Sequence, residues 1–273
     1  MPILSELSKP TDWVDPDDVP RPAVCYGFVT SEFDGMELDF HQHLKGQIIL
    51  VQRGALSCEV EGGMWIVPPR SAIWIPGGAR HALKLATGAL EGYNAFVSPE
   101  VGNGLPATCC TISVTPLLRE VLTRAANLPL LYEESGPNDR LIGVLLDELA
   151  IAKIEHLHLP MPTDSRLRRI IQAMIDAPGD RGTLAVWASR VGMSERTLER
   201  LVHSETSLSF GRWRQQIAIV TAVKWMAGGA SIQDVAADLG YESVPSFVTM
   251  FKKALGTSPG RYMMERYALT ARA

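Results

Sequence analysis

The stretch from Thr183 to Tyr262 contains one sequence pattern twice, and this repeat constrains the fold more than any other feature. In each copy a small residue stands four positions before a glycine, a short polar turn follows, and apolar residues then recur at helical spacing. This order is typical of a helix-turn-helix, in which the small residue lets two helices approach and the glycine forms the turn. The small residue, the glycine and the capping serine are Ala188, Gly192 and Ser194 in the first copy and Ala236, Gly240 and Ser243 in the second. Two copies, 48 residues apart at their glycines, predict two such motifs.

The rest of the C-terminal half is predicted to be helical as well. Asp164 or Ser165 is a suitable N-cap, and Pro259 is suited to begin a short last helix. The other expected helices cover residues 165–176, 183–190, 194–205, 208–227, 231–239 and 243–255. We therefore expect an all-α domain over residues 158–273.

Charge is distributed unevenly between the two halves. Residues 1–162 carry 11 Lys and Arg against 20 Asp and Glu, whereas residues 163–273 carry 15 against 10. A basic half on a chain with a net charge of −4 fits a nucleic-acid contact confined to that half.

The N-terminal half, residues 1–157, is rich in short β-type runs. They cover residues 24–29, 47–52, 56–60, 64–67 and 72–75, and Gly and Pro clusters separate them. Strands of this length and spacing favour an antiparallel barrel or sandwich. The chain is thus expected to be an α+β protein of two domains.

Three histidines and a glutamine in this half are candidate metal ligands. His41 and His43 are two residues apart, so on a strand their side chains share one face, and Gln47 lies on that face if the strand continues. His81 follows a Pro-Gly-Gly turn, where a neighbouring strand would begin. Three imidazoles and an amide oxygen can hold one divalent transition metal, such as Ni, Zn, Fe or Mn.

The same residues resemble the cupin family. The first cupin motif is matched at every spacing by Gly35, His41, His43, Gln47 and Gly54, and the core of the second by Pro76, Gly78 and His81. The resemblance implies a cupin-like antiparallel β-barrel with flanking helices and a metal or ligand pocket. Gln47 stands where metal-binding cupins usually have Glu, and Leu85 where the second motif usually ends in Asn. A hydrogen-bonded pocket without metal therefore remains an alternative.

Two amphipathic segments, residues 115–126 and 137–152, are predicted to be connector helices. Thr115 is a suitable cap for the first, and Asn138 or Asp139 for the second. An apolar stripe of Leu141, Leu145, Leu149 and Ala152 either packs the second helix against the first and the barrel or forms a homodimer contact. The Leu- and Pro-rich segment that follows, with His156 and His158, is interpreted as a solvated interdomain linker.

The C-terminal half resembles the DNA-binding domain of AraC-type transcription regulators over about 100 residues. The most specific part begins at Gly240-Tyr-Glu-Ser243 and continues through Ser246-Phe247, Phe251-Lys252-Lys253 and Gly256-Thr-Ser-Pro259 to Tyr262. By this resemblance, Arg196, Glu199 and Arg200 fall on the base-facing positions of the first motif. The spacing agrees, because Leu198, Leu201 and Val202 must face the core and leave these three side chains outward.

The second motif departs from the family pattern. Thr249 stands where members often carry Arg, and Val244 and Pro245 occupy the leading edge of its second helix. Such a surface offers few hydrogen bonds that distinguish bases. The side chains better suited to backbone contacts are Ser246, Thr249, Lys252 and Lys253. We expect the first motif to carry most of the sequence specificity and the second mainly affinity.

These features together predict a transcription regulator that binds double-stranded promoter DNA and senses a small molecule or a metal. The alternatives are a metal-cupin enzyme, an oxygenase or isomerase, and a constitutive DNA-binding protein whose barrel only dimerises. Against the enzyme, Gln47 replaces the carboxylate and no separate acid–base group is evident. The N-terminus has no signal-peptide pattern, no apolar run is long enough to span a membrane, and the four cysteines fit free thiols in the cytoplasm.

Overall fold

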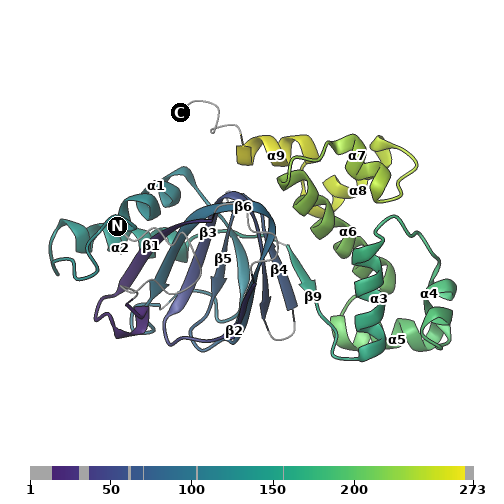
Figure 1. Cartoon of the computed structure of the whole chain (residues 1–273), viewed down its shortest axis with the longest axis horizontal. Helices are drawn as coiled ribbons and strands as arrows, with labels where there is room; N and C mark the ends of the chain where they lie inside the picture. The colour runs from purple at the N-terminus through teal and green to yellow at the C-terminus, as the bar shows by residue number, and fades with distance from the viewer. Residues whose placement is uncertain are drawn as a thin grey trace. The chain divides into compact units, whose positions relative to one another are not determined.

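The computed structural model describes residues 14–30, 37–60, 63–69, 71–102, 104–155 and 157–267 (Figure 1). The chain divides into two compact units, one formed by residues 1–61 and 67–156 and the other by residues 62–66 and 157–273. The sequence placed the division after residue 157, one position later. That a short segment of the N-terminal half, residues 62–66, belongs to the second unit was not predicted from the sequence.

The N-terminal unit is built on an antiparallel sheet, as expected. A short 3-10 helix, η1 (Pro16–Asp18), precedes it. Its strands are β1 (Ala23–Thr30), β2 (Glu37–His41), β3 (Gly46–Val60), β5 (Ser71–Ile75), β6 (His81–Val97), β7 (Cys110–Ser113) and β8 (Ile154–Glu155). They follow the order β1-β6-β3-β5-β7-β8, and β2 also pairs with β6.

One long strand, β3, replaces two of the predicted strands. The sequence placed a turn at Gly54, between the runs 47–52 and 56–60. In the structure Gly54 adopts a φ of +83°, and the register with β6 shifts between Val51 and Leu56. The glycine thus belongs to an irregular, bulge-like part of a continuous strand and not to a turn, because an extra residue bends a strand without ending it.

The connector helices α1 (Pro116–Ala125) and α2 (Pro137–Ala150) lie against the sheet of this unit (Figure 1). Leu145 and Leu149 of the predicted stripe are buried with Leu118 and Leu122 of α1 and with side chains of the sheet. The stripe therefore packs α2 inside the unit, which is the first of its two expected uses.

The capping prediction holds for α1 and fails for α2. The Thr115 hydroxyl accepts a hydrogen bond from the Leu118 amide at 3.0 Å. The N-cap of α2 is Gly136, which has no side chain to cap with, so the prediction of Asn138 or Asp139 was wrong. Asp139 instead accepts a hydrogen bond from the Ser135 amide, at 3.1 Å, within the preceding turn.

The second unit is helical, as expected. Its helices are α3 (Ser165–Asp176), α4 (Leu184–Arg190), α5 (Glu195–Thr206), α6 (Phe210–Ala227), α7 (Ile232–Asp238), α8 (Val244–Leu255) and α9 (Pro259–Tyr267) (Figure 1). Asp164 is the N-cap of α3. Among the described residues, no helix combines the length and the apolar character needed to cross a membrane.

The two predicted helix-turn-helix motifs are α4–α5 and α7–α8. Gly192 and Gly240 form their turns with φ values of +67° and +70°, in the left-handed region that glycine adopts without strain. The hydroxyls of Ser194 and Ser243 cap α5 and α8. Each second helix buries apolar side chains in one shared core: Leu198 and Val202 from α5, and Phe247 and Phe251 from α8.

The predicted solvated linker is ordered where it is described. Strand β9 (His158–Pro160) pairs with β4 (Gly63–Val67), whose first four residues belong to the segment grouped with the second unit. The His158 ring is half-buried and stacks on Trp65, with ring centroids 4.5 Å apart. The expectation that His158 is solvated was therefore wrong, although the division between the two units does fall in this segment, and His156 lies outside the described residues.

Candidate effector pocket and DNA interface

The structure brings the three predicted histidines together in the N-terminal unit. His41 ends β2 and pairs across the strands with His81, the first residue of β6, while His43 lies in the loop after β2. One possible ligand atom from each ring lies within 4.8 Å of those of the other two. The ring centroids of His41 and His81 are 4.2 Å apart, and those of His43 and His81 are 5.1 Å apart.

The loop that carries His43 is held from two sides. The Asp17 carboxylate accepts hydrogen bonds from the backbone amides of Leu44 and Lys45, at 2.6 and 2.9 Å. On the other side, the Gly78 amide donates to the His43 carbonyl at 2.8 Å. Residues that are far apart in the sequence therefore hold the backbone of the loop that carries this imidazole.

Gln47 joins the cluster through its side-chain oxygen. The Gln47 Oε1 atom lies 3.2 Å from Nε2 of His43 and 3.2 Å from Nε2 of His81. Gln47 and His81 are buried, whereas His41 and His43 are half-buried. The cluster thus combines two buried side chains with two partly exposed ones.

The opposite ring nitrogens show where the protons lie. Each Nδ1 faces a backbone carbonyl: that of Asp39 at 2.9 Å for His41, that of Ala79 at 2.8 Å for His81, and that of Lys45 for His43. A carbonyl only accepts, so each Nδ1 carries a proton, and a neutral ring then has a lone pair on Nε2. Burial, more than any other cause, lowers the pKa of His81 to about 4, which keeps that ring neutral.

This donor set fits a divalent transition metal. With His81 neutral and its proton on Nδ1, its Nε2 atom and the Gln47 oxygen are both acceptors, so no proton joins these two atoms across their 3.2 Å separation. Ligands about 2.0–2.1 Å from one tetrahedral ion would lie about 3.3 Å from each other. Donation of the second ring N–H to a backbone carbonyl is also the usual arrangement for a metal-bound histidine.

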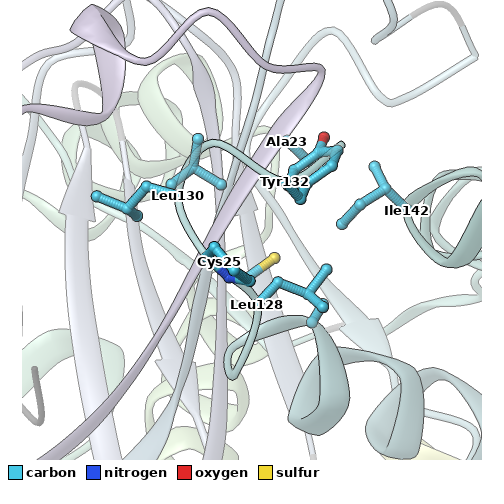
Figure 2. A pocket seen from close by; sticks show the side chains of 9 residues that line it. Ala23, Cys25, Leu128, Leu130, Tyr132 and Ile142 are labelled. Carbon is cyan, nitrogen blue, oxygen red and sulfur yellow. The ribbon is translucent and has the colours of Figure 1, made fainter. Parts of the chain in front are cut away.

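A cavity elsewhere in this unit is too small for an effector. It measures about 10 Å³, which is room for one water molecule. Cys25, Leu128, Tyr132 and Ile142 are among the side chains around it (Figure 2). Burial raises the pKa of the Cys25 thiol to about 12, so this cysteine stays protonated and unreactive.

In the second unit, α5 presents two of its three predicted base-contacting residues freely. Arg196 and Arg200 are exposed. Glu199 is half-buried, and its carboxylate accepts a hydrogen bond from the Phe210 amide, at 3.3 Å, at the start of α6. Glu199 thus has an intramolecular partner that the sequence did not indicate, and its contact with a base stays a prediction.

Helix α8 presents a different set of groups. Ser246, Thr249, Lys252 and Lys253 are all exposed, as expected. The Thr249 hydroxyl donates to the carbonyl of Pro245 at 2.9 Å, and the Ser246 hydroxyl lies 2.9 Å from that of the capping Ser243. The two hydroxyls already have partners in the helix or at its N-cap. The charged groups of this surface are the two lysines, which have no ion-pair partner among the described residues.

A cleft of about 300 Å³ lies beside Lys253. The described residues that line it are Leu208, Arg212, Gln215, Gln216, Lys253 and Ala254. None of these six is acidic, and neither Arg212 nor Lys253 has an acidic partner among the described residues. Arg212 was not among the predicted DNA-binding residues, although Arg212, Gln215 and Gln216 share one face of α6 through their i, i+3, i+4 spacing.

Comparisons with known proteins agree with both units. The family described as AraC-like ligand binding domain matches residues 26–177, and the one described as helix-turn-helix domain matches residues 187–265. The HTH-type transcriptional regulator NimR of Escherichia coli K12 is 40% identical over 249 residues, which are 91% of this chain and 90% of NimR. The chain belongs to the AraC family of transcription regulators.

More distant relatives of this AraC-family member are also regulators. The HTH-type transcriptional regulator RipA of Corynebacterium glutamicum is 29% identical over 103 residues, which are 38% of this chain and 31% of RipA. Among solved structures, fatty-acid-bound ToxT of Vibrio cholerae is 12% identical with a TM-score of 0.39, covering 90% of this chain and 96% of that chain. Family membership makes the chain a DNA-binding transcription regulator with an N-terminal ligand-binding domain, and not an enzyme.

Proposed function

We propose that the pocket of His41, His43, Gln47 and His81 is the sensing site of this regulator and that it takes one divalent transition metal, Ni, Zn, Fe or Mn. The observation that supports this most directly is the convergence of acceptor atoms, with Gln47 Oε1 3.2 Å from two imidazole nitrogens. A bound dication would accept these converging lone pairs, which have no proton donor between them. The histidines and Gln47 would hold it, and the Asp17-fixed loop would keep His43 in place.

Sensing requires that the effector change the affinity for promoter DNA. An effector shifts this affinity only if it binds two arrangements of the protein with different strength, and the coupling is then reciprocal. The expected coupling is therefore visible from either side, as metal-dependent DNA binding or as DNA-dependent metal binding.

The test is a titration of metal-stripped full-length protein with each of the four ions, followed by promoter binding with and without the ion. Under the proposal, one ion binds at one equivalent, His81→Ala abolishes that binding, and promoter affinity changes on loading. His203→Ala is the matched control, since His203 is an exposed histidine of α5 outside the cluster. If none of the four ions binds at one equivalent, the proposal of a metal site is refuted.

A small organic effector is the second candidate for the same pocket. The Phe96 ring packs edge-on against His43, with centroids 5.2 Å apart, and Tyr26 packs on Phe96. These rings give the pocket an apolar wall suited to an organic molecule. Retention of effector-dependent promoter binding in a His81→Ala protein that binds no metal would favour this candidate.

On the DNA side, we propose that α5 reads bases and that α8 and the cleft beside it hold backbone phosphates. Arg196 and Arg200 carry planar groups that can pair bidentately with guanine, whereas Lys252 and Lys253 are point charges. Arg212 faces the same cleft as Lys253 and so extends the positive surface from α8 onto α6. Arg212→Ala is expected to weaken binding to all DNA sequences alike, as measured by binding to promoter and random duplexes.

A homodimer through the connector helices is proposed on their outer face, since the predicted stripe is buried. Val144 and Ile151 are seven residues apart, so they share a helix face, and they are 42% and 74% exposed; Leu117 of α1 is 52% exposed. The double change Val144→Glu and Ile151→Glu is expected to give monomers in sedimentation velocity. Leu131→Glu, at a 64% exposed leucine outside these helices, is the control and should leave the oligomeric state unchanged.

A further inference from the structure

The donor set of the histidine pocket supplies lone pairs but no negative charge. Each imidazole has its proton on Nδ1, and the fourth donor is an amide oxygen. Among the described residues, the cluster with metal-ligand geometry contains histidines alone, without an Asp or Glu side chain. Neutral imidazoles and an amide cannot offset the charge of a dication.

Asn94 fixes which atom of Gln47 faces the histidines. Gln47 Nε2 donates a hydrogen bond to Asn94 Oδ1 at 3.1 Å, and this leaves Gln47 Oε1 directed at His43 and His81. Asn94 on β6 pairs with Ile49 on β3, two residues from Gln47, so the two amides are diagonal neighbours on one face of the sheet. A glutamate at position 47 has no N–H to donate, so this contact is specific to the amide.

An uncompensated dication is costly on the buried side of the pocket. His81 is 0% and Gln47 4% exposed, and a buried charge without a counter-charge is strongly unfavourable. His41 and His43 are only half-buried, so a ligand from solvent can reach the donor atoms from their side. The counter-charge is therefore best supplied by a small anion that enters there.

We propose that Gln47 and its positioning residue Asn94 keep this donor set neutral, so that the metal held there takes a small anion, such as a carboxylate, as its further ligand. The inference rests on the proposed metal pocket and names the chemical class of the second effector component. Sensing would then require the ion and the anion together.

The experiment uses Co²⁺ as a spectroscopic probe in the full-length protein and sodium acetate as the anion. Co²⁺ is bound first and its visible absorption recorded; acetate is then added at constant pH and ionic strength. Wild type is expected to show a saturable change in the Co²⁺ bands. Gln47→Glu supplies the missing carboxylate, so it should still bind Co²⁺ but lose the acetate-induced change. Gln52→Glu, elsewhere on β3, is the matched control and should behave as wild type.

Asn94→Ala tests the positioning role separately. Loss of a residue that orients a ligand typically weakens metal binding by about 10- to 100-fold, and the acetate response of the loaded protein should persist. Asn94→Asp, which keeps an acceptor for Gln47 Nε2, should restore most of the affinity. Circular dichroism of the metal-free variants establishes that each one folds.

The outcomes separate the inference from the pocket on which it depends. If wild type binds no Co²⁺, the metal pocket and the inference both fail. If wild type binds Co²⁺ and acetate leaves its spectrum unchanged, the proposal of a metal site is supported and the proposal of an anionic ligand is refuted. An acetate response that survives in Gln47→Glu as strongly as in wild type also contradicts the role of the neutral amide.

Discussion

The two recognition helices, α5 and α8, are built alike but present different chemistry. Each has 12 residues, begins after a serine N-cap and ends at a left-handed residue, Ser207 for α5 and Gly256 for α8. Both bury two side chains in the same core. On the outer faces, α5 presents arginines, whereas α8 presents lysines and hydroxyls that are already hydrogen-bonded within the helix.

The difference separates the scaffold from the function. Capping and core packing decide that a helix forms and where it lies, and these are shared by the two motifs. The exposed face decides what the helix can recognise, and here the motifs diverge. Guanidinium groups can read a base edge with two hydrogen bonds, whereas ammonium groups respond mainly to phosphate charge. We therefore expect α5 to contribute specificity and α8 affinity.

The largest effects should come from the shared scaffold. Phe247→Ala in α8 should lower the free energy of unfolding by about 3–5 kcal/mol, and Leu198→Ala in α5 should lower it by about 2–5 kcal/mol, because both side chains are fully buried. Hydrogen exchange of backbone amides in the second unit measures both losses. Thr249→Ala, on the exposed face, should change stability by less than about 0.5 kcal/mol. Markedly unequal losses of stability from the Phe247 and Leu198 substitutions would show that the core does not stabilise the two motifs to the same extent.

The next largest effect should be on sequence recognition. Arg200→Ala is expected to weaken the free energy of binding to the preferred DNA site by about 1–3 kcal/mol and to relax discrimination at one base position. The measurement is binding to the operator and to its single-base variants at one salt concentration. Thr249→Ala serves as the comparison on α8. Equal loss of discrimination from both substitutions would refute the division between α5 and α8.

A smaller and uniform effect is expected from the lysines of α8. Lys252→Ala should weaken binding to all DNA sequences alike and lower the salt dependence of the binding constant by about 0.9 in log–log slope, the value for one phosphate contact. Titrations of specific and random duplexes at several salt concentrations measure both quantities. A change confined to the specific duplex would assign Lys252 to base recognition.

The sequence predicted the second unit better than the first, for a physical reason. Helix caps, glycine turns and apolar spacing are local, so Ser194, Gly192 and Leu198 could be placed from neighbouring residues alone. Strand pairing is not local: nothing near Gly54 distinguishes a turn from an irregular position in a long strand.

The candidate sites show the same limit. The histidines were found because they form a motif, whereas Asn94 and Asp17 act on partners far along the chain and gave no local signal. The pairing of β9 with β4 likewise depends on residues about 95 positions apart, so a Pro-containing segment looked like an open linker.

Substitution of Glu199 is expected to have the smallest effect, and it tests directly whether this residue of α5 contacts a base. Its carboxylate accepts from the Phe210 amide at 3.3 Å, so one oxygen already stabilises the start of α6. If that is its only role, Glu199→Gln should keep the contact through its amide oxygen, cost at most about 0.5–1 kcal/mol of stability, and leave the operator preference unchanged. If the carboxylate also accepts from a cytosine amino group, the same substitution should shift the preference at one base pair. Binding to single-base operator variants, together with unfolding of the same protein, separates the two roles, and the hydrogen bond to Phe210 favours the first.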